Sequence, residues 1–248
     1  MRSPSNNHAG NILFLILLAI VLFAALTVAV NGGFRVSQDQ NIPKEKARSI
    51  ASQIINYTTL MEQSVTRMRI TGGCTIEQLD FDRAPDFTGY DGLNTPADGR
   101  CKLFDTNGGG VPFVKPDPTW FDGVNNGQYW YGEYFFNGAN YVTNIGTTAA
   151  GVDTSAELTV LLLYLKKDIC VALNDLLNIK PSDPPPSEGS SIAAGQFSRW
   201  GEPNIHRFGS SPTRLWDNNP EARTSGCLTM TSSPVPGAYF FFHTLVVR

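Results

Sequence analysis

The three histidines are the side chains best suited to acid–base or metal chemistry, and their positions argue against both. His8 lies near the start of the chain, His206 in a polar stretch and His243 in an apolar segment near the end. They lack the spacing that gathers a metal ion, and no HExxH, GxSxG, GxGxxG or Walker motif is present. Gly108-Gly109-Gly110 lacks the lysine that follows a phosphate loop. We therefore predict a domain that is not an enzyme, with a hydrolase of unrecognised residues as the least favoured alternative.

Three acidic residues, Asp80, Asp82 and Asp86, lie close enough in sequence to suggest a calcium loop. Hard cations bind where several oxygens converge, but this spacing is not that of an EF-hand. Arg83 also lies among the three carboxylates. The segment favours a solvated acidic loop, and we expect no cofactor, with calcium as the alternative.

All four cysteines, Cys74, Cys101, Cys170 and Cys227, are well separated and none forms a CxxC pair. An even number of such cysteines suggests two disulfides in an oxidising compartment, although four buried thiols remain the alternative. Three pairings are possible. We favour Cys74–Cys101 and Cys170–Cys227, because pairing sequence neighbours closes the shorter loops.

Five large aromatic residues could form a stacking platform for a glycan or a protein partner: Trp120, Phe121, Tyr129, Trp130 and Tyr131. Aromatic side chains in strand segments more often pack in the core. Their alternation cannot bury all five on one face, so we expect some to be exposed and to mark an interaction site.

An uncharged apolar run, Ile12–Val30, dominates the start of the chain. Nineteen helical residues span about 28 Å, close to the ~30 Å hydrocarbon core of a bilayer. We predict a polar segment over 1–10, a transmembrane helix over 11–31, a hinge over 32–43 and a water-facing domain over 44–248. The lysines and arginines that follow the helix would place this domain in the cytoplasm, but the cysteines argue for the opposite side and we follow them. The net charge of −3 and the absence of a basic stripe argue against a nucleic-acid partner.

The domain combines two helix patterns with several strand patterns, which predicts an α+β fold with an antiparallel sheet. A single apolar stripe predicts an amphipathic helix over 44–70. Aromatic residues around Asn137-Gly138 predict a hairpin over 128–143. Thr154 to Glu157 has capping-box spacing, and the apolar stripe after it predicts a buried helix over 158–179. Cys227–Met230 and Tyr239–Val247 predict closing strands.

This layout resembles the type IV pilin superfamily, including the pseudopilins of type II secretion systems. A polar leader ends in Gly10, and the apolar segment starts at once with Asn11. The resemblance implies cleavage between these two residues, followed by packing of the apolar helices, residues 12–30, in the core of a filament. Most members carry glutamate at the fifth mature position, which is Leu15 in this chain. That departure implies a minor or tip-located subunit.

The leading hypothesis is therefore a pilin-like structural subunit in the inner membrane, with its domain in the periplasm or outside the cell and other pilin-like subunits as partners. The alternative is a single-pass membrane-anchored module that binds a glycan or protein and forms no filaments. Leader cleavage separates the two, because a pilin is processed before it assembles whereas a signal anchor keeps residues 1–10.

Overall fold

The computed structural model describes residues 16, 18, 19, 42–146, 156–187, 200, 213–216, 222–231 and 235–248. Its contacts divide the chain into two units, Met1–Asn41 and Ile42–Arg248. Within the described residues, no helix is both long and apolar enough to cross a membrane. The predicted leader and hinge lie outside these residues except for the last two hinge positions, and so does nearly all of the predicted membrane segment.

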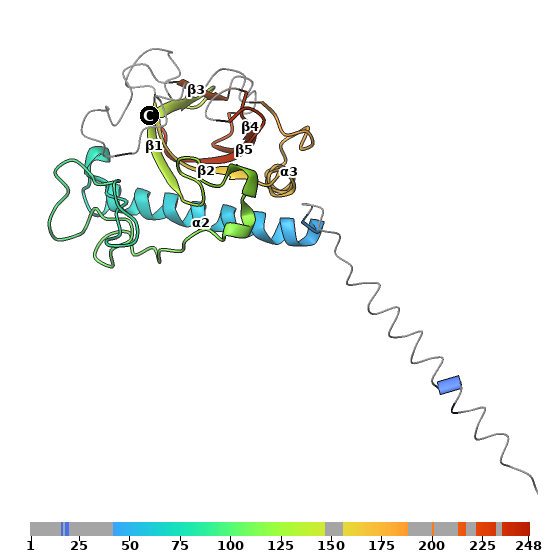
Figure 1. The fold of residues 1–248 in the computed structure, drawn as a ribbon. Coiled ribbons are helices and arrows are strands. Elements are labelled where there is room, and N and C mark those ends of the chain that lie inside the picture. Colours follow the sequence, from blue (N-terminus) through green and yellow to red (C-terminus); the bar gives the residue numbers. More distant parts are fainter. Residues whose placement is uncertain are drawn as a thin grey trace, which may run out of the picture. The chain divides into compact units, whose positions relative to one another are not determined.

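Among its described residues, the second unit has an α+β fold built on a five-stranded sheet (Figure 1). Its strands are β1 (Phe135–Val142), β2 (Glu157–Leu165), β3 (Thr213–Trp216), β4 (Ser225–Thr229) and β5 (Tyr239–Val246), in the order β3-β1-β2-β5-β4. The four strands β1, β2, β5 and β4 are antiparallel, whereas β3 pairs in parallel with β1. The predicted α+β class and antiparallel sheet are confirmed, as are the two closing strands.

Helix α2 (Lys44–Ile70) has the bounds that its apolar stripe predicts. Its stripe residues Ile50, Ile54 and Val65 are buried, and the helix contacts β5 and α3. Figure 1 shows α2 (blue) running beside the sheet. The helix ends at Ile70 with Thr71 as its C-cap, and Gly73 then turns the chain with a positive φ of 65°, a conformation that glycine enters without steric penalty. One face of α2 thus closes the core.

The predicted helix over 158–179 is wrong in its first half. Residues 157–165 form the central strand β2, and only Lys167–Leu176 is helical, as α3. Every residue of β2 is buried, so both faces of the strand are covered and its many leucines also fit a helical stripe. Glu157 consequently starts a strand and does not serve as the third residue of a capped helix.

The predicted hairpin at Asn137-Gly138 is also wrong. These two residues lie inside β1, where the pairing with β2 shifts register between Asn137 and Asn140. The Asn137 side chain accepts a hydrogen bond from the Ala139 backbone amide, so the local Asn-Gly bend becomes an irregularity within one strand. The aromatic residues 129–131 form a turn before the strand.

Both predicted disulfides are confirmed in the predicted pairing. Cys74–Cys101 joins the end of α2 to the loop-rich segment that follows it. Cys170–Cys227 joins α3 to β4, and the buried Asn174 side chain reinforces that junction by bonding both backbone groups of Cys227. In the loop segment, Phe81 stacks on Phe136 of β1 with ring centroids 4.2 Å apart, so aromatic packing joins this segment to the main core. Three short 3-10 helices, Ile76–Gln78, Pro118–Trp120 and Gly123–Asn125, complete the described elements.

Candidate functional site

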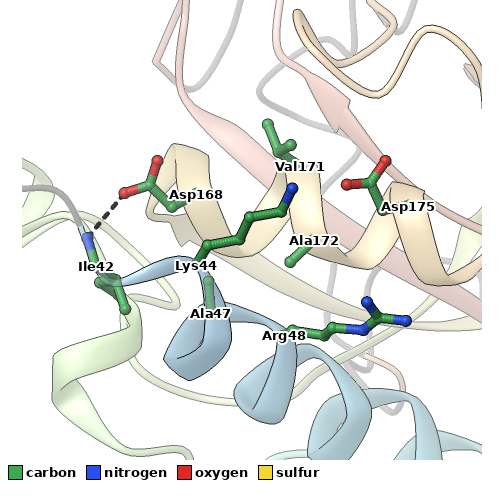
Figure 2. Close-up of a pocket in the computed structure, with 8 residues that line it drawn as sticks. All are labelled: Ile42, Lys44, Ala47, Arg48, Asp168, Val171, Ala172 and Asp175. Atoms are coloured by element: carbon green, nitrogen blue, oxygen red, sulfur yellow. Dashed lines mark hydrogen bonds between the residues drawn. The ribbon is translucent and has the colours of Figure 1, made fainter.

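A hollow of about 460 Å³ lies between the first turns of α2 and helix α3. Figure 2 shows Lys44 and Arg48 extending from α2 along it, with Asp168 and Asp175 on α3. Asp168 accepts a hydrogen bond from the Ile42 backbone amide at 2.9 Å. Asp175 bonds Ser182 and Lys180, which lower the pKa of its carboxyl group. Acidic and basic groups balance across this groove, which suits a contact with another polar surface better than a site for one small ion.

A second hollow, of about 410 Å³, lies at the start of β4. Arg223 lines it and donates hydrogen bonds to the backbone carbonyls of Leu177 and Asn178, just after α3. Ser225 lines the hollow and faces His243 across the β4–β5 pair.

A hydrogen-bonded network links β4, β5 and α2 through three side chains, Ser225, His243 and Glu62. Ser225 Oγ lies 2.5 Å from His243 Nδ1, and His243 Nε2 lies 3.0 Å from Glu62 Oε2. A carboxylate oxygen only accepts, so Nε2 carries the ring proton and Nδ1 accepts from the Ser225 hydroxyl. The imidazole is buried, whereas the Glu62 side chain is 43 % exposed.

Sequence reasoning placed His243 in the last strand but missed this chain of residues. Its members are separated by 18 and 181 positions, so only the pairing of β4 with β5 and the docking of α2 bring them together. The other two histidines, His8 and His206, lie outside the described residues.

The five predicted aromatic residues do not form one platform. Trp120 and Phe121 are buried, Trp130 and Tyr131 are half-buried, and Tyr129 is 80 % exposed. Trp130 packs on Phe135 with ring centroids 4.6 Å apart. Tyr129 therefore remains the one member of this set with a freely accessible ring.

A shallow apolar hollow of about 380 Å³ lies beside Trp120, on the outer side of α2. Tyr57 and Leu60 of α2, Val114 and Tyr134 complete its apolar wall, and Gln53 and Asn56 add amide groups. The Tyr57 hydroxyl is engaged, because it donates to the Pro112 carbonyl and accepts from the Val114 amide. Sequence reasoning did not combine α2 with the loop residues that complete this hollow.

The acidic residues 80–86 stabilise their loop from within. Asp80 is buried, accepts from the Asp82 amide and lies 3.4 Å from Lys102 Nζ. Burial raises the pKa of Asp80 and of Asp82. Asp86 pairs with Arg83 in an exposed ion pair. The expected solvated loop is wrong for Asp80, because that side chain is buried. Across the part of the chain that the structure describes, no three His, Cys, Asp or Glu side chains are grouped to hold a metal ion.

A buried polar row crosses the sheet, and the sequence did not predict it. Its members are Asn137, Asn140, Glu157, Thr159 and Thr244. Glu157 accepts a hydrogen bond from the Val142 amide at 2.8 Å, while its second carboxylate oxygen has no partner among the described residues. Burial raises the pKa of Glu157 to about 8, so this side chain is largely protonated at neutral pH.

Comparisons with protein-family models, with curated proteins and with solved structures found no match for this chain. The predicted cleavage residues Gly10 and Asn11 lie outside the described residues.

Proposed function

We infer that the chain is a pilin-like or pseudopilin-like structural subunit, anchored in the inner membrane and minor in its filament. One observation carries the inference. The amphipathic helix α2 begins 14 positions after the apolar run that ends at Val30, and its apolar stripe packs on an antiparallel, disulfide-bearing domain. This order of elements matches the resemblance drawn from the sequence.

The two disulfides support a domain outside the cytoplasm, because such bonds persist in oxidising compartments. Residues 12–30 would then provide the contacts between subunits. An uncut chain keeps Arg2 and a charged terminus beside this segment, and burying them in a filament core would be unfavourable. Leu15 has no charge to pair with a neighbour's terminal amine, which favours a minor position.

The test compares two leader variants in membranes of the native host. Gly10→Leu should block cleavage and leave a membrane monomer, because a bulky side chain at the cut keeps the backbone away from the peptidase. The control, Asn6→Leu, adds a similar side chain away from the cut. Chemical cross-linking followed by immunoblotting reports both mass and assembly. A Gly10→Leu chain that is cut and cross-linked like the wild type would contradict the proposal.

The second candidate function is a membrane-anchored module that binds a glycan or protein without forming filaments. The exposed Tyr129 ring and the apolar hollow beside Trp120 favour it. A chain that keeps residues 1–10 and loses ligand binding on Tyr129→Ala would support this candidate.

A further inference from the structure

We propose that Ser225, His243 and Glu62 form a nucleophilic triad that hydrolyses small carboxylic esters at the hollow beside β4. The proposal goes beyond the structural role inferred above and is independent of leader cleavage. It revises the expectation of a non-catalytic domain, which relied on motifs that are contiguous in the sequence.

The geometry meets the first requirement of such a site, because the nucleophile lies within hydrogen-bond reach of the base. The Ser225 Oγ to His243 Nδ1 distance of 2.5 Å allows direct proton transfer. Glu62 is the positioning residue. Its hydrogen bond to Nε2 fixes the tautomer in which Nδ1 accepts the serine proton. Triads of this kind recur on unrelated folds and are recognised by geometry and roles.

The surroundings meet the second requirement, which is access for the substrate. His243 is buried, so its imidazole ring is held in one orientation between its two partners. Ser225 borders a hollow of about 410 Å³. That volume falls at the low end of small-molecule sites and suits a short acyl group. The Arg223 guanidinium in the same hollow favours an ester that also carries a negative charge.

The reaction balances without a cofactor. Ser225 Oγ bonds to the acyl carbon as its proton moves to His243 Nδ1. The bond from the acyl carbon to the alcohol oxygen breaks, and that oxygen takes the proton from Nδ1. Water then attacks the acyl-serine by the same route, which releases the carboxylic acid and restores the Ser225 hydroxyl.

The decisive experiment treats the purified full-length chain with diisopropyl fluorophosphate and maps the adduct by peptide mass spectrometry. A stoichiometric adduct on Ser225 is expected. Hydrolysis of 4-nitrophenyl hemisuccinate should be faster than that of 4-nitrophenyl acetate, and Ser225→Ala should lower it at least about 10²-fold. The exposed Ser49→Ala is the matched control and should hydrolyse like the wild type.

Glu62→Gln tests the positioning role against a merely structural one. It should lower kcat about 10²-fold or more with little change in KM, because tautomer control acts on the chemical step. Glu45→Gln, an exposed change in the first turn of the same helix, should leave kcat unchanged.

Absence of an adduct on Ser225, or a Ser225→Ala chain as active as the wild type, would overturn the triad. The three residues would then only stabilise the packing of α2 on the sheet through their hydrogen bonds. If Ser225→Ala fails to fold, the wild-type adduct still decides the question. Its presence on Ser225 supports the triad, and its absence refutes it.

Discussion

Shortening one buried side chain of α2 tests whether the helix is fastened to the sheet through its apolar stripe. Ile54 lies mid-helix and is fully buried in the core. Ile54→Ala removes three carbon atoms, worth about 0.8 kcal/mol each in transfer free energy, and leaves a cavity that raises the loss to about 2–5 kcal/mol. Because alanine has a higher helix propensity than isoleucine, it offsets this loss of stability by a few tenths of a kcal/mol. We therefore expect unfolding to become easier by about 3 kcal/mol.

For a domain of this size, 1 kcal/mol shifts Tm by roughly 2–4 °C, so Ile54→Ala should lower Tm by about 10 °C. The matched control is Ile70→Ala in the last position of the same helix, where the side chain is 79 % exposed. An exposed change of this kind stays within about 0.5 kcal/mol. Thermal unfolding of the oxidised full-length chain, followed by far-ultraviolet circular dichroism, measures both. Equal Tm shifts for the two variants would refute the docking of α2 on the sheet.

Two further predictions concern the disulfides and the buried carboxyl group. Cys170–Cys227 spans 57 positions, so replacing both cysteines by serine should cost about 4 kcal/mol, against slightly less for the 27-position Cys74–Cys101 loop. Non-reducing peptide mapping should recover these two pairs, and a Cys74–Cys170 peptide would contradict them. Glu157 has a folded pKa of about 8 against an ordinary 4.5, so the native state holds a proton that the unfolded state releases. The free energy of unfolding of the wild type should therefore fall as pH rises from about 4.5 to about 8. In urea titrations over this range, Glu157→Gln should show a flatter dependence of this free energy on pH. Equal slopes for the two proteins would show that Glu157 is not the cause.

The sequence was sufficient for elements whose pattern has one interpretation. Helix α2 has one apolar face and a glycine pair after its end, so its stripe predicts its bounds and its buried residues. The closing strand β5 is rich in aromatic and β-branched residues and admits no helical alternative. The disulfide pairs followed from loop length alone.

The central strand β2 and the Asn137-Gly138 segment could not be predicted by the same reasoning. Periodicity distinguishes a helix from a strand only when one face is apolar. β2 is buried on both faces, and its leucines also fit the apolar positions of a helix. Asn-Gly is a turn signal only when its flanking strands pair with each other, whereas β1 pairs with β2 through both of its halves. In both places tertiary pairing overrides the local signal.

The candidate site was less predictable than the fold, because its residues meet only through long-range packing. From the sequence alone, Glu62 is predicted to be an exposed residue of an amphipathic helix. Ser225 is only a polar residue before a short predicted strand. Their link through His243 depends on the register that places Ser225 opposite His243. The spacing of residues along the sequence does not predict this strand register.

The mass of the intact protein extracted from native membranes tests the central claim most directly. A pilin-like subunit cut after Gly10 should have the mass of a chain that begins at Asn11 and holds two disulfides. A mass that begins at Met1, or a soluble product cut near Ala29, would contradict the account.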